Sequence, residues 1–178
     1  MQAANQITMD AVVHKNRLWV LLGDDLSGGD TTFVTHTRRS VNTTTWTSPT
    51  NQPANNTPAT AASYTDVPLG VIIDFDNVLY AFIHDTTNRR VRCYKTADEG
   101  DTAWVAAGDL SSGQGARGKA NWYDLQGDPA PVIGTAEGVW ALDVSASVMQ
   151  LIFPMPFNQD NCRAMVARGN RLYVSAGS

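Results

Sequence analysis

The sequence predicts an all-β fold built of repeated four-stranded units, which is the arrangement of a β-propeller. Two observations lead to this prediction. First, residues 16–20 (NRLWV) and 170–174 (NRLYV) differ by one aromatic exchange, and 77–81 (NVLYA) and 138–141 (GVWA) are looser copies. Second, each copy places a turn-forming or small residue before an aliphatic and an aromatic residue, a pattern typical of a turn that enters a buried strand. A strand that recurs with turns between its copies indicates a repeat architecture.

The repeat divides the chain into four units. Their approximate bounds are 10–48, 63–110, 121–157 and 160–178, and the connecting loops are 49–62 and 111–119. The first three units each contain four predicted strands, whereas the fourth reaches only its second strand. The first loop is rich in Pro, Asn and Thr and the second in Gly and Ser, so we expect both to be exposed and to tolerate change.

The repeated strands predict the core. In a propeller the sheets stack face to face, so a strand between two neighbours can be apolar without alternation. The residues expected to form this repeat core are Leu18, Trp19, Leu79, Tyr80, Val139, Trp140, Leu172 and Tyr173. A β-sandwich is the structural alternative, because it also consists of many short strands. We prefer the propeller because the units repeat in order, which a Greek key does not require.

The composition limits the classes of binding partner that the chain can have. With 43% hydrophobic residues among 178 the chain can bury a core, and its 18 threonines suit β-structure. The formal charge of −4 argues against a nucleic-acid-binding surface, and no run of about 18 apolar residues predicts membrane insertion. The polar N-terminus shows no signal peptide. We interpret Cys93 and Cys162 as two buried free thiols, a single disulfide being the alternative, and we expect no cofactor.

One short motif resembles a known element. Thr96, Asp98, Gly100 and Thr102 match the Asp-box of sialidase-like propellers, in outline Ser/Thr-x-Asp-x-Gly-x-Thr-Trp, and Trp104 follows one place late. This resemblance implies a structural turn between the third and fourth strands of a blade, away from a catalytic centre. The physical reading agrees, because a short acceptor side chain and a glycine stabilise a tight hairpin.

A second copy of the motif is eroded. Ser40 and Asn42, followed by Trp46, occupy the corresponding place in the first unit. Elsewhere the sequence predicts no catalytic or metal-binding residue. His14, His36 and His84 have no ligand spacing, Glu99 and Glu137 lie in predicted turns, and Asp24, Asp25 and Asp30 suit a turn better than a calcium loop.

The C-terminal third carries another resemblance. Residues 134–143, 153–157 and 163–174 look like the propeller repeats of phage tail and other virion proteins. This resemblance implies a non-enzymatic structural or adhesion module in a virion or extracellular assembly, whose partners are other subunits or further blades. The alternative hypothesis is part of an Asp-box glycan-processing enzyme, or a carbohydrate-binding module that uses exposed Trp and Tyr residues.

We expect residues 1–178 alone not to form a closed domain, because propellers typically contain 4–8 blades of four strands. Uncovered faces and strand edges favour pairing or aggregation. Measuring the mass of the isolated chain in solution tests this expectation. A stable monomer that unfolds cooperatively would contradict it.

Overall fold

The computed structural model describes residues 6–24, 35–49, 53, 70–85, 89–98, 103–111 and 115–177. These residues form strands and no helix, so the prediction of an all-β fold is confirmed. The strands are β1 (Gln6–His14), β2 (Arg17–Asp24), β3 (Thr35–Ser40), β4 (Gly70–Phe75), β5 (Val78–Asp85), β6 (Arg90–Thr96), β7 (Val105–Leu110), β8 (Gly118–Tyr123), β9 (Pro129–Thr135), β10 (Gly138–Asp143), β11 (Val148–Pro154), β12 (Met165–Arg168) and β13 (Arg171–Val174).

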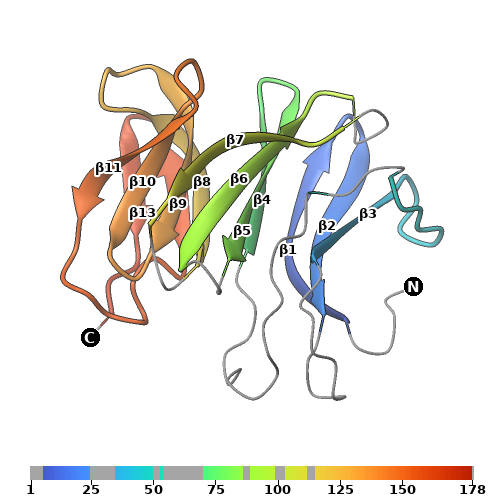
Figure 1. Ribbon diagram of the computed structural model, residues 1–178, viewed down its shortest axis with the longest axis horizontal. Coiled ribbons are helices and arrows are strands. Elements are labelled where there is room, and N and C mark those ends of the chain that lie inside the picture. Colours follow the sequence, from blue (N-terminus) through green and yellow to red (C-terminus); the bar gives the residue numbers. More distant parts are fainter. Residues whose placement is uncertain are drawn as a thin grey trace.

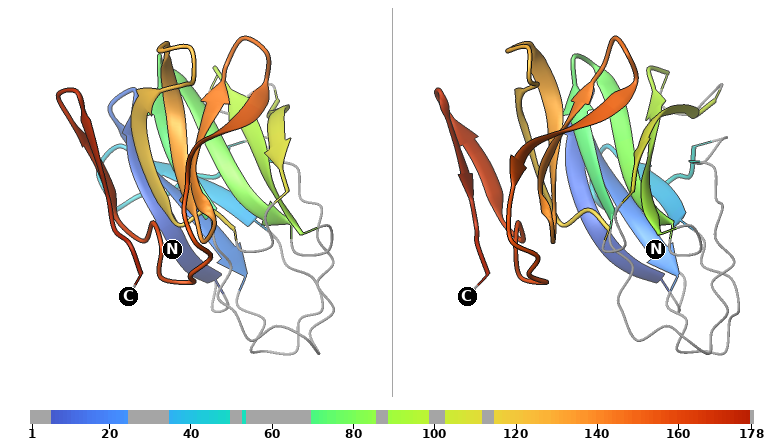
Figure 2. Two further views of the ribbon diagram at one scale, coloured as in Figure 1. Left: turned by 90° about the vertical axis from the view of Figure 1, so that its left-hand side faces the viewer. Right: turned by 60° about the vertical axis from the view of Figure 1, so that its left-hand side comes forward.

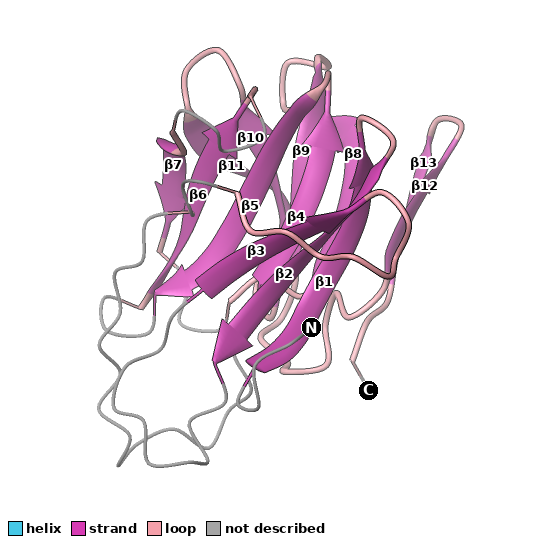
Figure 3. Ribbon diagram, turned by 90° about the vertical axis from the view of Figure 1, so that its right-hand side faces the viewer, coloured by secondary structure: helices cyan, strands magenta, loops and turns pink. Residues whose placement is uncertain are grey.

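The strands form four antiparallel sheets in chain order. The first sheet is β1-β2-β3, the second β4-β5-β6-β7, the third β8-β9-β10-β11 and the fourth β12-β13. Figure 1 shows the sheets following one another across the molecule, and Figure 2 shows the β12–β13 hairpin at one end of this row. The first strands of successive sheets contact each other, β1 with β4, β4 with β8, and β8 with β12. They lie on one side of the molecule in Figure 3, and we call this side the first-strand edge.

Two-residue turns join the first two strands in the first and second sheets. Lys15 and Asn16 have φ values of 46° and 60°, and Asp76 and Asn77 have values of 50° and 59°. Positive φ at both positions is the type I′ geometry, whose twist matches that of the flanking strands, and Asn and Asp tolerate it well. These turns therefore fix the registers in which Val13 lies opposite Leu18 and Phe75 opposite Val78.

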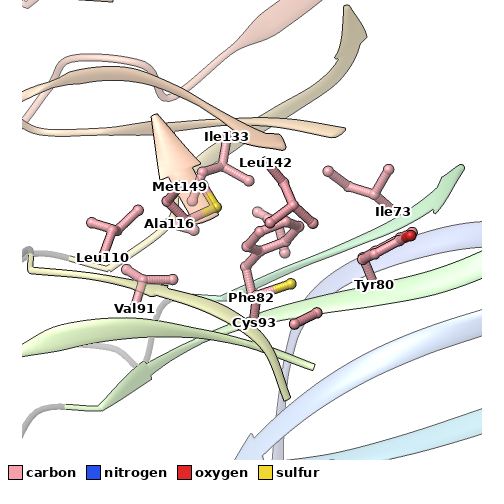
Figure 4. Packing of buried hydrophobic residues seen from close by; sticks show 12 residues of the cluster. Ile73, Tyr80, Phe82, Val91, Cys93, Leu110, Ala116, Ile133, Leu142 and Met149 are labelled. Carbon is pink, nitrogen blue, oxygen red and sulfur yellow. The ribbon is translucent and has the colours of Figure 1, made fainter. Parts of the chain in front are cut away.

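The core lies between the sheets. Along β4, Val71 and Ile73 face the third sheet, whereas Ile72 between them faces the first. The second sheet therefore buries both faces, as the continuous apolar sequence of β4 and β5 predicts. Figure 4 shows the cluster between the second and third sheets, which includes Ile73, Tyr80, Phe82, Val91, Cys93, Leu110, Ala116, Ile133, Leu142 and Met149. A smaller cluster, which includes Val132, Val139 and Cys162, joins the third sheet to the fourth.

The 138–141 copy of the repeated strand does not occupy the place of the others. It lies on β10, the third strand of its sheet, whereas the other copies lie on the second strands β2, β5 and β13. The second strand of the third sheet is β9, which has no aromatic residue. Its Gly134 pairs with Gly118 of β8, and a side chain at either glycine would collide with Cys162 and Met165 of the fourth unit. Close approach between the sheets therefore excludes a large residue there.

Burial of the predicted repeat core varies along the chain. Trp19, Leu79, Tyr80 and Val139 are buried, Leu18, Trp140 and Leu172 are partly buried, and Tyr173 is 49% exposed. Tyr173 is exposed because the outer face of the β12–β13 hairpin, where it lies opposite Val166, packs against no described sheet. The buried residues lie on sheet faces that pack against a neighbouring sheet.

The two predicted loops also differ from expectation. In the 111–119 segment Ala116 is buried in the core, and Gly118 and Lys119 begin β8. The Gly-rich composition suggested a flexible linker, but small residues here allow the close approach of the fourth unit. In the 49–62 segment Pro49 and Pro53 are buried, and the other residues lie outside the described part of the chain.

We predict that Trp19→Ala lowers the free energy of unfolding by about 3–5 kcal/mol, because it removes a fully buried indole. Tyr173→Ala is the matched control, and we expect it to cost about 1 kcal/mol or less because the ring is half exposed. Chemical denaturation of both variants measures the difference. Equal losses would contradict the burial of Trp19 between two sheets.

Candidate functional site

Polar side chains from three neighbouring sheets meet along the first-strand edge. They come from β1, β4 and β8, and we call them the edge cluster: Asp10, His14, Asp74, Lys119 and Asn121. A first strand has a partner on one side only, so the backbone groups on its other side need side-chain or solvent partners. The edge cluster supplies such partners.

A β-bulge directs Asp10 toward the second sheet. The register of β1 against β2 shifts between Thr8 and Asp10, so one extra residue is inserted in β1 at this point. The carboxylate oxygen Oδ2 of Asp10 then accepts a hydrogen bond of 2.8 Å from the backbone N–H of Ile72 in β4. Asp10 therefore caps a backbone donor on the open side of β4.

Lys119 joins three sheets through one ammonium group. Its Nζ lies 2.6 Å from Asp10 Oδ2 and donates to the carbonyl oxygens of Ala11, at 2.6 Å, and Ile72, at 2.8 Å. An ammonium group has three donors, so these contacts use all of them. The side chains of Lys119 and Asp10 are 27% and 19% exposed, which leaves their attraction only partly screened by water. Lys119 is therefore a structural clamp whose donors are already occupied.

Asp74 is held from both neighbouring sheets. Its Oδ1 lies 3.1 Å from Nδ1 of His14, and its backbone carbonyl accepts a hydrogen bond of 2.9 Å from Asn121 Nδ2. His14 is fully buried and packs edge-to-face on Trp19, with ring centroids 6.3 Å apart. When Nδ1 donates to the carboxylate, Nε2 of the neutral ring is an acceptor, and it has no hydrogen-bond partner among the described residues. The imidazole therefore orients the Asp74 carboxylate.

Three acceptors of the edge cluster remain open. Asp10 Oδ1, Asp74 Oδ2 and the amide oxygen of Asn121 make no hydrogen bond to any residue that the structure describes. Asp10 meets β4 at Ile72, which is two residues, or roughly 7 Å, from Asp74 along the strand. The cluster thus presents two carboxylates on adjacent strands, a chemistry suited to binding hydroxyl groups and moving protons. The described residues contain no group of three His, Cys, Asp or Glu side chains that could hold a metal ion.

The sequence-predicted turns lie elsewhere, between the third and fourth strands of their units. After β6, Thr96 Oγ1 donates to Asp98 Oδ1 at 2.8 Å, whereas Gly100 and Thr102 lie outside the described residues. Trp104 is buried between the first and second sheets, which explains an aromatic at this place. The motif is therefore separated from the first-strand edge by the width of its own sheet.

The eroded copy forms a similar turn after β3. Ser40 Oγ donates to Asn42 Oδ1 at 3.3 Å. Asn42 Oδ1 also accepts hydrogen bonds from the backbone N–H groups of Thr44 and Thr45, at 3.0 and 2.8 Å. Trp46 Nε1 donates to the Thr43 carbonyl. The side-chain oxygen thus replaces backbone partners in the turn, as the residue types predict.

A third turn of this kind, after β10, was not predicted. Asp143 Oδ1 accepts hydrogen bonds from Ser145 Oγ, at 2.7 Å, and from the backbone N–H of Ala146, at 2.8 Å. The N–H of Ala146, and then the Ser145 hydroxyl, lower the pKa of Asp143. This segment lacks both the glycine and the tryptophan of the motif, and only its alternation of Asp and Ser could have revealed it.

The edge cluster itself was also missed. Asp10, Asp74 and Asn121 fall inside or beside predicted strands, and Lys119 was assigned to a loop. His14, predicted to be an ordinary strand or turn histidine, is the last residue of β1. His84 lies in β5, and Glu137 in the turn before β10. Cys93 and Cys162 are both free and buried, and burial raises the pKa of each thiol. No helix long and apolar enough to cross a membrane occurs in the described part of the chain.

Comparisons with known proteins place the fold. No family model matches the sequence, and neither does any curated protein. Among solved structures, the chain is similar to a Trypanosoma rangeli sialidase in complex with a difluoro-KDN, with a TM-score of 0.61 and 14% identity over 98% of this chain and 30% of that one. It is also similar to an exo-β-1,3-galactanase from Phanerochaete chrysosporium, with a TM-score of 0.54 and 14% identity over 98% and 48% of the chains. A third is the Bombyx mori β-fructofuranosidase BmSUC1, with a TM-score of 0.51 and 15% identity over 92% and 41%.

These similarities confirm the partial β-propeller, since the matched structures have propeller folds. The chain spans less than half the length of each of the three solved structures. The prediction of a non-enzymatic module is contradicted, because these structures are glycoside hydrolases. That prediction depended on the phage-tail resemblance and on the lack of an obvious catalytic motif. A site assembled from single residues on separate strands leaves no such motif.

We predict that Lys119→Met destabilises the protein by about 1–3 kcal/mol, because the Asp10 carboxylate and two carbonyls lose their common donor while the side-chain length is kept. Lys95→Met is the matched control, since the side chain of Lys95 makes no ion pair or hydrogen bond to a described residue. Urea denaturation compares the two variants. An unchanged unfolding midpoint for Lys119→Met would show that the clamp adds nothing.

Proposed function

We propose that this chain forms blades of a glycan-processing β-propeller and that its edge cluster binds the sugar. The observation that carries the proposal is the pair of open carboxylate oxygens on adjacent first strands, Asp10 Oδ1 and Asp74 Oδ2. In a propeller the blades surround a central channel, and the first-strand edge is the side on which the first strands of all four sheets come together. Hydroxyl groups of a sugar are donors that these oxygens accept.

The two carboxylates are suited to different roles. Asp10 lies against the ammonium group of Lys119, which holds its carboxylate in place, and we assign it as the general base. Asp74 lies 3.1 Å from His14 and is more exposed than Asp10, and we assign it as the general acid. The water oxygen bonds to the anomeric carbon as the glycosidic C–O bond breaks, Asp10 takes the water proton, and Asp74 protonates the leaving oxygen. This is an inverting mechanism, in which one carboxyl group activates water and the other protonates the leaving oxygen.

The turns after β3, β6 and β10 support the same assignment. Each places an Asn or Asp oxygen where it accepts local hydrogen bonds between the third strand and the residues that follow it. We interpret them as three variants of the Asp-box turn. Their recurrence in three successive units favours the glycan-processing alternative over a structural role in a virion.

The exposed residues of the fourth sheet support the proposal that the chain is part of a larger assembly. Val166 and Tyr173 lie opposite each other on β12 and β13, and both are about half exposed. We propose that further blades or another subunit cover them, as the sequence led us to expect. A virion or extracellular location remains a prediction from sequence.

Fluorogenic glycosides and a glycan array test the function. We expect hydrolysis by the wild-type protein, and a loss of about 100-fold or more in kcat for Asp10→Asn and Asp74→Asn, because each variant removes a proton-transfer group. Asp128→Asn is the matched control, since this exposed carboxylate lies in the β8–β9 turn. Binding without hydrolysis would support a carbohydrate-binding module instead, and neither binding nor hydrolysis would overturn the proposal.

A further inference from the structure

A cavity of about 540 Å³ opens between the second and third sheets, apart from the edge cluster. Its walls come from the β4–β5 hairpin, the end of β6 with the turn that follows, the start of β7, and Val144 after β10. Its volume falls within the range of small-molecule pockets, roughly 300–1,000 Å³. None of its lining residues belongs to the edge cluster, so a ligand here would not compete directly with a sugar there.

Most of the wall is apolar. Phe75, Val78, Val105 and Val144 supply the larger apolar side chains, and the Phe75 and Tyr80 rings meet edge-to-face with centroids 6.4 Å apart. A sugar would place several hydroxyl groups against these side chains without hydrogen bonds, which is costly. The walls therefore favour a ligand whose body is a hydrocarbon ring.

Tyr80 supplies an unused polar group. The residue is 2% exposed and lines the cavity, yet its hydroxyl makes no hydrogen bond to any described residue. Figure 4 shows the hydroxyl at the edge of the core cluster, on the side away from Phe82. The hydroxyl is open to the cavity, and a hydrogen bond from it to a ligand acceptor would contribute about 0.5–1.5 kcal/mol. Burial, the Cys93 thiol and the Asp76 carboxylate all raise the pKa of Tyr80, which keeps the hydroxyl protonated as a donor.

The charges around the cavity define the ligand further. Lys95 lies directly opposite Tyr80 in the β5–β6 register, and Asp76 and Asp98 also line the cavity. Two carboxylates against one ammonium disfavour a ligand with a negative charge. The Lys95 ammonium, which has no partner among the described residues, is a second donor for a neutral acceptor. A carbonyl group matches both donors.

We infer that this cavity binds a small neutral molecule with an aromatic ring and a carbonyl acceptor, which receives a hydrogen bond from the Tyr80 hydroxyl. The ring occupies the apolar wall formed by Phe75, Val78 and Val144. Lys95 approaches the same carbonyl from the neighbouring strand. The site is separate from the proposed glycan site, and the two proposals can fail independently.

The test uses two probes of nearly equal shape, acetophenone and ethylbenzene, of which only the first has a carbonyl. NMR titration of the 178-residue chain should show acetophenone binding with a Kd of about millimolar order, as expected for so small a ligand. Tyr80→Phe should weaken acetophenone binding about 3–10-fold and leave ethylbenzene binding unchanged. Val105→Trp, which adds bulk at the wall, should weaken both.

Tyr94→Phe is the matched control, because Tyr94 lies on the same sheet but faces the first sheet, and its hydroxyl accepts from Arg92. It should leave the binding of both probes unchanged. Failure of acetophenone to bind the wild-type protein would overturn the inference, as would an equal effect of Tyr80→Phe on both probes. Binding of a tryptophan-containing peptide in place of acetophenone would also overturn it, since the cavity would then be a site for a protein side chain.

Discussion

The open side of the β4 backbone sets the main constraint on this structure. A first strand of a sheet has unpaired N–H and C=O groups, and β4 lies between two other sheets where unsatisfied groups are costly. Asp10 caps the Ile72 N–H, Lys119 caps the Ile72 carbonyl, and Asn121 caps that of Asp74. Because the caps come from β1 and β8, satisfying one strand also fixes the relative positions of three sheets.

This arrangement connects stability with the candidate site. The side of Asp10 that meets Lys119 is occupied, so only its other oxygen is available to a ligand. Likewise, His14 occupies one oxygen of Asp74 and leaves the second. The structural contacts thus determine which oxygens remain available to a ligand. His14 itself packs against Trp19, an aromatic residue of the repeated strand. This ring contact connects the core between the first two sheets to the edge cluster.

Sequence reasoning predicted the parts of the fold that depend on local patterns. The turns at Asn16 and Asn77 and the apolar strands after them were recognisable because type I′ turns and buried strands have characteristic residues. The place of Trp140 on the third strand of its sheet could not be recognised from the sequence. A second and a third strand can have the same sequence pattern and differ only in the strands that lie beside them. Lys119 was assigned to a loop because the residues before it are rich in Gly and Ser. Its contacts could not be predicted because its partners are distant in sequence, 108 residues away for Ala11. Sites built from such distant residues have no local signature.

The contact between the third and fourth units has a consequence for how the sequence can vary. Gly118 and Gly134 lie side by side on β8 and β9, and their missing side chains leave the space that Cys162 and Met165 fill. A methyl group at Gly118 would meet the backbone carbonyl of Cys162 and would need a shifted backbone, whereas one at Gly134 would meet only the side chains of Cys162 and Met165. Residues 134, 162 and 165 therefore share one fixed volume. Related sequences should vary at these positions in a correlated way, so that a larger residue at position 134 accompanies a smaller one at position 162 or 165.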